Sequence, residues 1–158
     1  MFRELSRKNK ALEIGECIQL LKNEKRGVLS VIGDNDYPYG MPMNHFYNED
    51  DGKLYFHCGK NGHRLDSIKN HDKVSFCAYD SGCKNDGEWA LNIKSVIVFG
   101  RIKVIDDIDK IVDIATKLCY KFTQDDEYIK SEIDKYARAT LLLQLSIEHI
   151  SGKSITES

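Results

Sequence analysis

Strand patterns that follow one another without intervening helices are the feature that most limits the fold of this chain. Between Gly27 and Gly59, the sequence GVLSVIGDNDYPYGMPMNHFYNEDDGKLYFHCG contains three β-type segments separated by the turns GDND and NEDDG. Parallel α/β folds need a helix between successive strands, and that alternation is missing here. The pattern therefore predicts a mainly β fold, an antiparallel β-barrel with two or three flanking helices.

The remaining residues supply the helices. Apolar residues that recur every three or four positions predict helices over residues 10–25, 107–122 and 127–137. A shorter helix is expected from His63 to Asn70, directly after the third strand.

Alternating apolar residues predict three further strands, at 74–79, 89–105 and 140–148. Gly100 is the expected bend of the long middle one. The whole chain, residues 1–158, is therefore predicted to be one domain with its barrel core in residues 27–105 and 140–148. Residues 149–158 are expected to form a flexible tail.

Charge and composition exclude several functional classes. The formal net charge is −2 and the lysines are scattered, so neither nucleic acid nor an acidic membrane surface is an expected partner. No apolar run approaches the roughly 18 residues that cross a bilayer, and the charged N-terminus lacks the apolar centre of a signal peptide. Five cysteines without CxxC spacing are typical of reduced thiols. These features predict a cytoplasmic protein.

The turn HCGKNGHRLD carries the charges best suited to an anionic ligand. Lys60, His63 and Arg64 flank two glycines, Gly59 and Gly62, at the start of the predicted helix. Backbone N–H groups at a helix N-terminus, together with Lys and Arg side chains, form a common phosphate site. The alternative is an ordinary surface turn whose charges are solvated, and the spacing alone favours that alternative.

Both prolines of the chain, Pro38 and Pro42, fall in the second predicted strand. Because proline cannot donate a ladder hydrogen bond, we expect this strand to bend near Met43, Asn44 and His45 and to leave backbone groups free. A flat aromatic ligand could lie against this bend and accept a hydrogen bond from Asn44. A bulged edge strand in which Asn44 closes a turn explains the pattern equally well.

A lone tryptophan follows the polar, glycine-containing loop at residues 80–88. Trp89, together with Ser95 and Val96 on the next strand, could wall a ligand pocket or a subunit interface. An ordinary core tryptophan is the simpler explanation of the same pattern.

Histidine and cysteine side chains near residue 57 offer at most three metal ligands. His57, Cys58 and His63 lack a fourth partner, and His57 and Cys58 face opposite sides because they are adjacent on a strand. Cys58 is better explained as a small buried residue, and no metal site is predicted. The motifs of nucleophilic hydrolases, zinc proteases and Walker-type nucleotide sites are also missing.

Taken in order, these segments resemble the pyridoxamine 5′-phosphate oxidase-like flavoproteins, specifically the branch that includes the nitroimidazole-resistance (Nim) proteins. The resemblance runs from residue 11 to residue 153 and is carried most specifically by LYFHCGKNGHRLDSIK followed by KSVIVFGRI. It implies an FMN-binding split β-barrel. Such a barrel holds FMN, or sometimes FAD, at the interface of a homodimer.

The resemblance also assigns roles to individual residues. The implied cofactor-binding residues are Pro42, Met43, Asn44, His45, His57, Cys58, Lys60, His63, Arg64, Ser95 and Val96. The backbone of the first four would meet the isoalloxazine ring, and the Lys60–Arg64 turn would hold the phosphate. Ser95 and Val96 would approach a flavin bound largely by the other protomer. Relatives often carry Arg-Lys where this chain has His63-Arg64.

The function implied is a flavin-dependent oxidoreductase that passes electrons to a nitroaromatic or another small acceptor, with NAD(P)H bound transiently. Trp89 and Lys153 would shape the substrate side, and His57 is the expected acid or base because histidine titrates near neutral pH. The alternative is a non-catalytic dimeric protein that stores or senses flavin or haem. His45, His57 and His63 are its candidate haem ligands.

Overall fold

The strand-rich pattern of the sequence folds into one antiparallel sheet. The computed structural model describes residues 1–157. The strands of these residues are β1 (Arg26–Ile32), β2 (Pro38–Asn44), β3 (Phe46–Asn48), β4 (Lys53–Gly59), β5 (Lys73–Tyr79), β6 (Leu91–Ile105) and β7 (Thr140–Glu157). Their order across the sheet is β2-β1-β5-β6-β7-β4-β3, and all neighbouring pairs are antiparallel. The predicted antiparallel β architecture is therefore confirmed.

The sheet is flanked by four α-helices within the described residues, and each lies where the sequence predicted a helix. Residues 1–157 form the α-helices α1 (Ile14–Asn23), α2 (His63–Asn70), α3 (Ile108–Cys119) and α4 (Asp126–Tyr136). Short 3-10 turns occur at η1 (Lys8–Lys10), η2 (Asp34–Asp36) and η3 (Ala137–Ala139). The bounds of α2 are those predicted from the sequence. None of the helices within residues 1–157 is long and apolar enough to span a membrane.

The starts of three helices are fixed by acidic side chains that bond to the backbone. Glu13 and Glu16 form a capping box at the start of α1, which therefore begins later than the predicted residue 10. Asp107 and Asp125 accept backbone N–H bonds at the starts of α3 and α4. These local bonds set where each helix begins, whereas the helices themselves were predicted from the spacing of their apolar residues.

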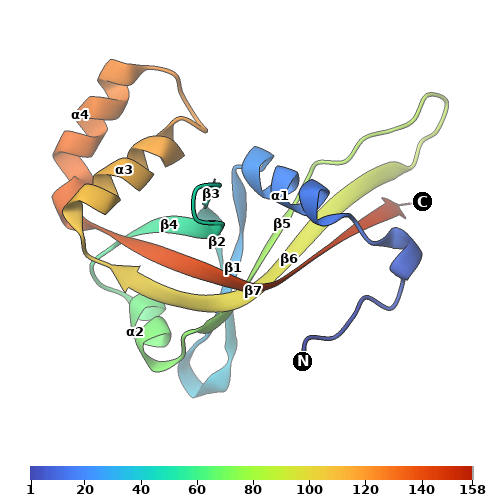
Figure 1. The fold of residues 1–158 in the computed structure, drawn as a ribbon, viewed down its shortest axis with the longest axis horizontal. Coiled ribbons are helices and arrows are strands. Elements are labelled where there is room, and N and C mark those ends of the chain that lie inside the picture. Colours follow the sequence, from blue (N-terminus) through green and yellow to red (C-terminus); the bar gives the residue numbers. More distant parts are fainter. Residues whose placement is uncertain (158) are drawn as a thin grey trace.

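The sheet curls into a half-barrel, with α1 packed at its concave side (Figure 1). The main core consists of alternate side chains from the strands that line the inside, including Leu29, Val31, Phe76, Ala78, Val96, Val98, Leu143 and Leu145. Cys17, Leu20 and Leu21 of α1 complete this core.

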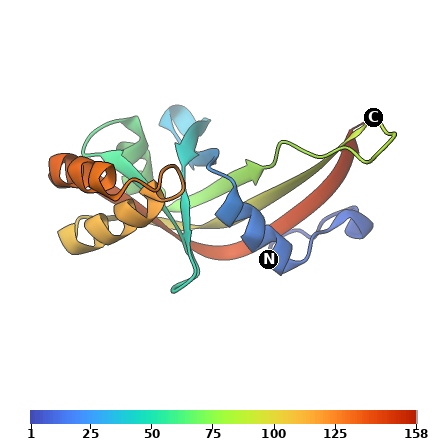
Figure 2. The same ribbon diagram turned by 90° about the horizontal axis from the view of Figure 1, so that it is seen from above.

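A second, smaller core lies on the other face of β4 and β7, beneath α3 and α4. Its buried residues are Tyr55, Ile111, Ile114, Ala137 and Leu142. Successive residues of β4 therefore enter different cores, because strand side chains alternate between faces. Figure 2 shows the α3–α4 hairpin at one end of the elongated molecule.

β6 and β7 form a long two-stranded ribbon. They pair from Leu91 opposite Glu157 to Ile105 opposite Leu142, and the register shifts between Phe99 and Gly100. This shift confirms the bend predicted at Gly100. The ribbon also shows that the predicted flexible tail is wrong for residues 149–157, because the first half of β6 pairs with them. The last tail residue, Ser158, lies outside the described residues.

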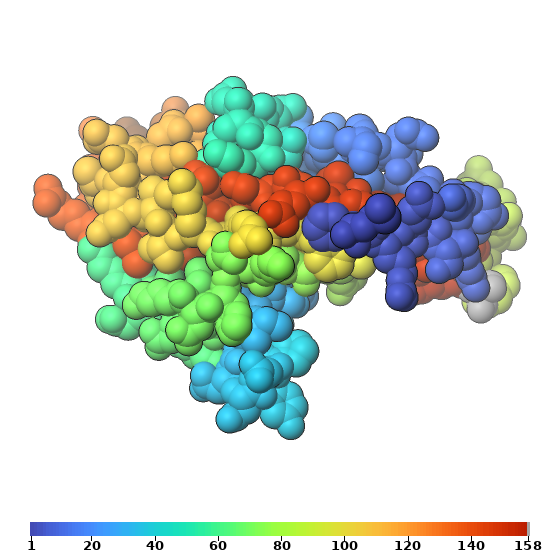
Figure 3. Space-filling view, turned by 60° about the horizontal axis from the view of Figure 1, so that its bottom comes forward, coloured from blue at the N-terminus to red at the C-terminus, as the bar shows by residue number. Residues whose placement is uncertain are grey.

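The N-terminal segment lies along β7, as Figure 3 shows. The backbone N–H of Leu12 donates to the carbonyl of Gly152 over 3.0 Å. Further out, the ring of Phe2 stacks on Phe99 and His149, with ring centroids 5.7 and 4.8 Å apart. The predicted helix 10–25 is thus preceded by an extended segment that pairs with the end of the ribbon.

Candidate functional site

The turn between β4 and α2 brings basic side chains to a helix N-terminus. Lys60 and Arg64 flank Gly62, the N-cap residue, whose φ of 126° favours glycine and leaves the helix without a side-chain cap. A Cβ added to Gly59 or Gly62 would meet nothing within 4 Å, so the space beside the turn is open. The first N–H groups of α2 and two cations therefore adjoin open space, an arrangement that attracts anions.

His63 is held by the turn between β1 and β2. Its Nε2 accepts a hydrogen bond from the backbone N–H of Asp34 over 3.4 Å, and its ring stacks on Tyr39 with centroids 4.4 Å apart. The Asp34 carboxylate lies 3.6 Å from the same nitrogen. This carboxylate opposes an anion at His63, so Lys60 and Arg64 supply most of the positive charge of the turn.

Arg64 spans the gap between α2 and β2. Its Nε donates to the sulfur of Met41 over 3.0 Å, which fixes the half-buried guanidinium against the edge of the barrel. Burial raises the pKa of the neighbouring Cys58 thiol, and the Arg64 charge only partly opposes that rise. Cys58 therefore stays protonated near neutral pH and is a poor nucleophile.

Strand β2 is an edge of the sheet next to this turn. It pairs with β1 along one side, and no other strand of residues 1–157 pairs with its second side. Met41 and Met43 are buried in the main core, whereas Pro42 is exposed. β2 ends at Asn44 and β3 begins at Phe46, which confirms the predicted bend. Backbone on one side of this segment is therefore available to a ligand.

His45 lies at the bend and is fully buried. Its Nε2 donates to the carbonyl of Leu21 over 2.8 Å, and its own carbonyl accepts from Lys121 Nζ over 2.9 Å. Burial first, and then the charge of Lys121, lowers the pKa of His45 to about 3. The neutral ring therefore supports the packing of α1, and its side chain does not point toward the turn.

His57 and Cys58 point to opposite faces of β4, as adjacent strand residues must. Cys58 packs against the main core, and His57 lines a cavity beneath α3 and α4. The resemblance implies that His57 and Cys58 line one site. Within a single chain, their side chains do not meet. Burial and the charge of Arg64 lower the pKa of His57, so its imidazole is neutral at neutral pH.

The other residues assigned by resemblance lie on or beside the β6–β7 ribbon. Ser95 is half-buried and its hydroxyl donates to the carbonyl of Lys153 over 3.5 Å, while Val96 is fully buried in the main core. Trp89 precedes β6 and is 73% exposed, so it is not a core residue. The free end of the ribbon lies away from α2 (Figures 1 and 2). A single chain therefore does not bring these residues to the basic turn.

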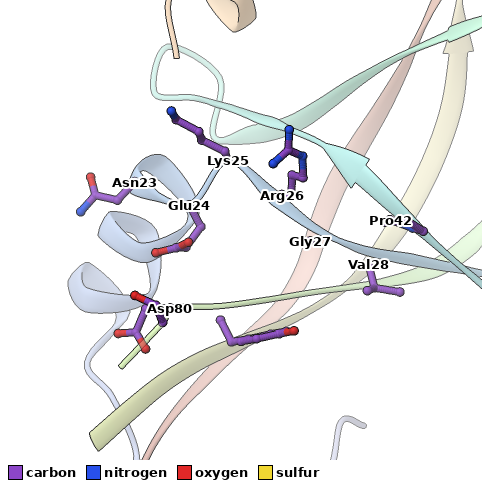
Figure 4. A pocket seen from close by; sticks show the side chains of 10 residues that line it. Asn23, Glu24, Lys25, Arg26, Gly27, Val28, Pro42 and Asp80 are labelled. Carbon is purple, nitrogen blue, oxygen red and sulfur yellow. The ribbon is translucent and has the colours of Figure 1, made fainter. Parts of the chain in front are cut away.

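A groove of about 560 Å³ opens between the end of α1, β1, β2 and the end of β5. Its lining residues are Asn23, Glu24, Lys25, Arg26, Gly27, Val28, Pro42, Tyr79, Asp80 and Ser81. Figure 4 shows Lys25 and Arg26 extending away from Glu24 and Asp80. Of these residues, only Pro42 is among the predicted cofactor-binding residues. The Lys25-Arg26 pair at the start of β1 is the sequence signal that could have indicated the groove.

Next to this groove, the outer face of β1, β5 and β6 carries exposed apolar side chains. They are Val28 (38% exposed), Tyr79 (62%), Ile97 (41%) and Phe99 (39%). A curled antiparallel sheet with a basic helix N-terminus beside a free edge strand places this molecule among the split β-barrel proteins.

The family model described as pyridoxamine 5′-phosphate oxidase matches residues 13–154 of the chain. The protein therefore belongs to the pyridoxamine 5′-phosphate oxidase family, as the resemblance predicted. No curated protein matches the sequence.

Solved structures share the fold at low sequence identity. A candidate 5-nitroimidazole antibiotic resistance protein from Bacteroides thetaiotaomicron has a TM-score of 0.78 at 15% identity, covering 93% of this chain and 87% of that one. An FAD-binding protein from Mesorhizobium loti has a TM-score of 0.65 at 21% identity, with coverage of 92% and 97%. An FAD and haem binding protein from Mycobacterium smegmatis has a TM-score of 0.71 at 19% identity, with coverage of 91% and 72%. These similarities confirm the predicted split-barrel fold.

Proposed function

We propose that this protein is a flavin-dependent oxidoreductase that binds FMN, with FAD as the other candidate cofactor, between two copies of the chain. The observation that carries the proposal is the uncapped N-terminus of α2, where Lys60 and Arg64 adjoin open space beside the free edge of β2. A flavin needs a phosphate site and a flat backbone surface within reach of each other. This part of the chain offers both.

The residues present fit the proposed group. The N–H groups of α2 and the side chains of Lys60 and Arg64 would hold the phosphate, since charge-assisted hydrogen bonds are stronger than neutral ones. The backbone of β2 near Pro42 would orient the ring. When bound, the flavin supplies the electron-transfer chemistry, and the protein contributes binding, orientation and electrostatics.

The acceptor that we propose is a small molecule of the nitroaromatic type, with NAD(P)H bound transiently as the electron donor. The similarity to a candidate 5-nitroimidazole antibiotic resistance protein supports this substrate class. Trp89 and Lys153, from the ribbon, are the proposed substrate-side residues. The proposed acid–base role of His57 requires an acceptor on the α3–α4 side of β4, because the side chain faces that way. The expected cytoplasmic location belongs to the same proposal.

A homodimer is part of the proposal because the ribbon residues and the basic turn are separated within one chain. A second copy placed on the exposed apolar face of β1, β5 and β6 would bring its Ser95 and Val96 toward the flavin, as the resemblance implies. Exposed apolar patches of this kind are typical of interaction surfaces.

The alternative is a non-catalytic flavin- or haem-binding protein, and one similar structure is described as binding both FAD and haem. His45 is unsuitable as a haem ligand, because it is fully buried and its Nε2 is bonded to Leu21. His57 and His63 remain as candidate ligands.

A visible absorption spectrum of the purified protein, recorded before and after adding FMN and desalting, tests the proposal. An oxidised-flavin spectrum that stays with the protein and is bleached by NAD(P)H is the expected result. A retained flavin that no donor bleaches would favour the storage or sensing function. A haem-like Soret band, or a protein that cannot retain any flavin, would overturn the proposed function.

A further inference from the structure

A small cavity lies between α3, α4 and the outer face of β4, and we call it the α3–α4 cavity. Its volume is about 150 Å³. Ile111 and Ala115 of α3, Ile133 of α4 and Ala137 give it mainly apolar walls that belong to or adjoin the second core. An apolar cavity of about this size in another protein binds benzene, so there is room here for one six-membered ring.

The side chain of His57, on β4, reaches this apolar space from the sheet. His57 is accessible to solvent, yet protein atoms surround it closely enough for burial to be the main cause of its lowered pKa. The positive charge of Arg64 acts in the same direction. The imidazole is therefore neutral at neutral pH and offers one N–H donor and one nitrogen acceptor.

The other polar groups in the wall select against charged ligands. The hydroxyl of Thr140 donates to the carbonyl of Tyr136 over 2.9 Å and is thus already engaged. Burial and the charge of Glu132 raise the pKa of the Cys119 thiol, which stays protonated and unreactive. The Glu132 carboxylate repels anions, and the Arg64 charge near His57 repels cations.

We propose that the α3–α4 cavity binds a small neutral aromatic molecule whose single hydroxyl or ring N–H group hydrogen-bonds to His57. The volume sets the size of the ligand, the apolar walls require an aromatic or aliphatic body, and the neutral imidazole provides one directional contact. The inference does not depend on flavin binding, because the proposed flavin site is formed by the start of α2 and the edge of β2, whereas this cavity lies beneath α3 and α4. If the proposed acid–base role of His57 holds, the same cavity is where the acceptor would bind, and to that extent the inference rests on the proposed function.

Calorimetric titration of the purified protein with phenol tests this inference, with toluene and benzoate as comparison ligands. Phenol is expected to bind once per chain, and benzoate, which has the same ring but a negative charge, roughly tenfold or more weakly than phenol. Replacing His57 by leucine should weaken phenol roughly tenfold while leaving toluene binding intact, because only the hydrogen bond is lost.

Ala115→Leu should abolish phenol binding, because its added carbons occupy the cavity. Val112→Leu is the matched control on the exposed side of the same helix and should bind phenol like the original protein. If Ala115→Leu does not fold, as shown by its thermal unfolding curve, Ala115→Val provides the smaller filling substitution. Absence of phenol binding in the original protein, or unchanged binding in a folded cavity-filled variant, would overturn the inference. The flavin spectrum of the same samples reports separately on the proposed function.

Discussion

Arg64 joins the proposed phosphate site to the frame of the barrel. Its contact with Met41 across the gap between α2 and β2 holds the guanidinium in place without a ligand. A preordered cation loses less conformational freedom when an anion binds. Lys60 is exposed and contributes charge without such a contact.

Replacing Lys60 and Arg64 together by alanine should weaken FMN binding by several kcal/mol, because charge-assisted hydrogen bonds contribute roughly 1.5–3 kcal/mol each. Fluorescence titration of FMN measures the change in affinity. Lys69→Ala is the matched control, since Lys69 lies in the last turn of α2, 3.8 Å from Asp66. Unchanged FMN affinity in the double variant would show that this turn is not the phosphate site.

His45 links three separate parts of the fold at one buried point. Its ring bonds to the end of α1, its carbonyl to Lys121 after α3, and Lys121 also donates to the carbonyl of Glu24 over 2.6 Å. His45 Nδ1 is buried without a hydrogen-bond partner among the described residues. Protonating the ring would place a second charge beside the Lys121 ammonium.

The free energy of unfolding should therefore fall in mild acid. Below pH 6.5 the unfolded chain protonates His45, but the folded protein does so only near pH 3, so protons favour unfolding across that window. The expected loss is about 1.4 kcal/mol per pH unit. Urea unfolding at pH 7, 6 and 5 measures it, with His45→Gln as the comparison because the amide can still donate to Leu21.

The His45→Gln variant should have a shallower dependence on pH than the original protein. His57 also has a lowered pKa, but it is present in both proteins and cancels in the difference. Parallel pH curves for the two proteins would contradict the assignment of this acid sensitivity to His45.

The role of a single residue could be predicted where the residues that act together are neighbours in the sequence. Lys60, His63 and Arg64 come together because the strand, two glycines and the helix are contiguous. The burial of His45 depends instead on α1 and on Lys121, which lies 76 residues further along the chain. No local pattern contains that information, and its side chain was accordingly not assigned a structural role.

At the scale of elements, the β6–β7 ribbon depends on one glycine. Gly100 sits at the register shift, where an added Cβ would overlap the backbone carbonyl of Ser146. The close approach lets the two strands continue on either side of the bulge. The ribbon then extends from the second core to the N-terminal segment.

Gly100→Ala should lower the free energy of unfolding by about 1–3 kcal/mol, since inserting a methyl group into a packed site forces the backbone to move. Gly15→Ala is the contrasting substitution. Gly15 lies in α1 with nothing within 4 Å of an added Cβ, so alanine should stabilise the protein by about 0.5–1 kcal/mol. Chemical unfolding of both variants measures these changes. A Gly100→Ala protein as stable as the original would show that the bulge tolerates a side chain.

Helices and strands with a regular spacing of apolar residues could be predicted from the sequence. The end of β7 could not. Residues 149–157 mix polar and small side chains, so their sequence resembles a tail. They form a strand because β6 pairs with them, and Gly152 fits closely against Cys17 of α1. A strand whose partner is distant in the sequence leaves little trace in its own pattern.

At the scale of the whole molecule, the half-barrel has two faces with different chemistry. The inner face is filled by the main core, and α3 and α4 cover the outer face of β4 and β7. The outer face of β1, β5 and β6 keeps Val28, Tyr79 and Ile97 exposed. This uncovered apolar face is the one on which we propose that a second copy packs.

Ile97→Glu should convert the proposed dimer to monomers. A two-fold interface presents the same patch from both copies, so one substitution introduces two carboxylates, and like charges brought together in an interface cost several kcal/mol. Analytical ultracentrifugation measures the mass of the particle in solution. The monomeric variant should also retain less flavin, because the proposed site draws residues from both copies.

Val112→Glu is the matched control, since Val112 is similarly exposed but lies on α3, away from this face. A protein that is monomeric before substitution, or a dimer that survives Ile97→Glu, would contradict this interface. Flavin retained by such a monomer would show that the basic turn and the edge of β2 suffice to bind it.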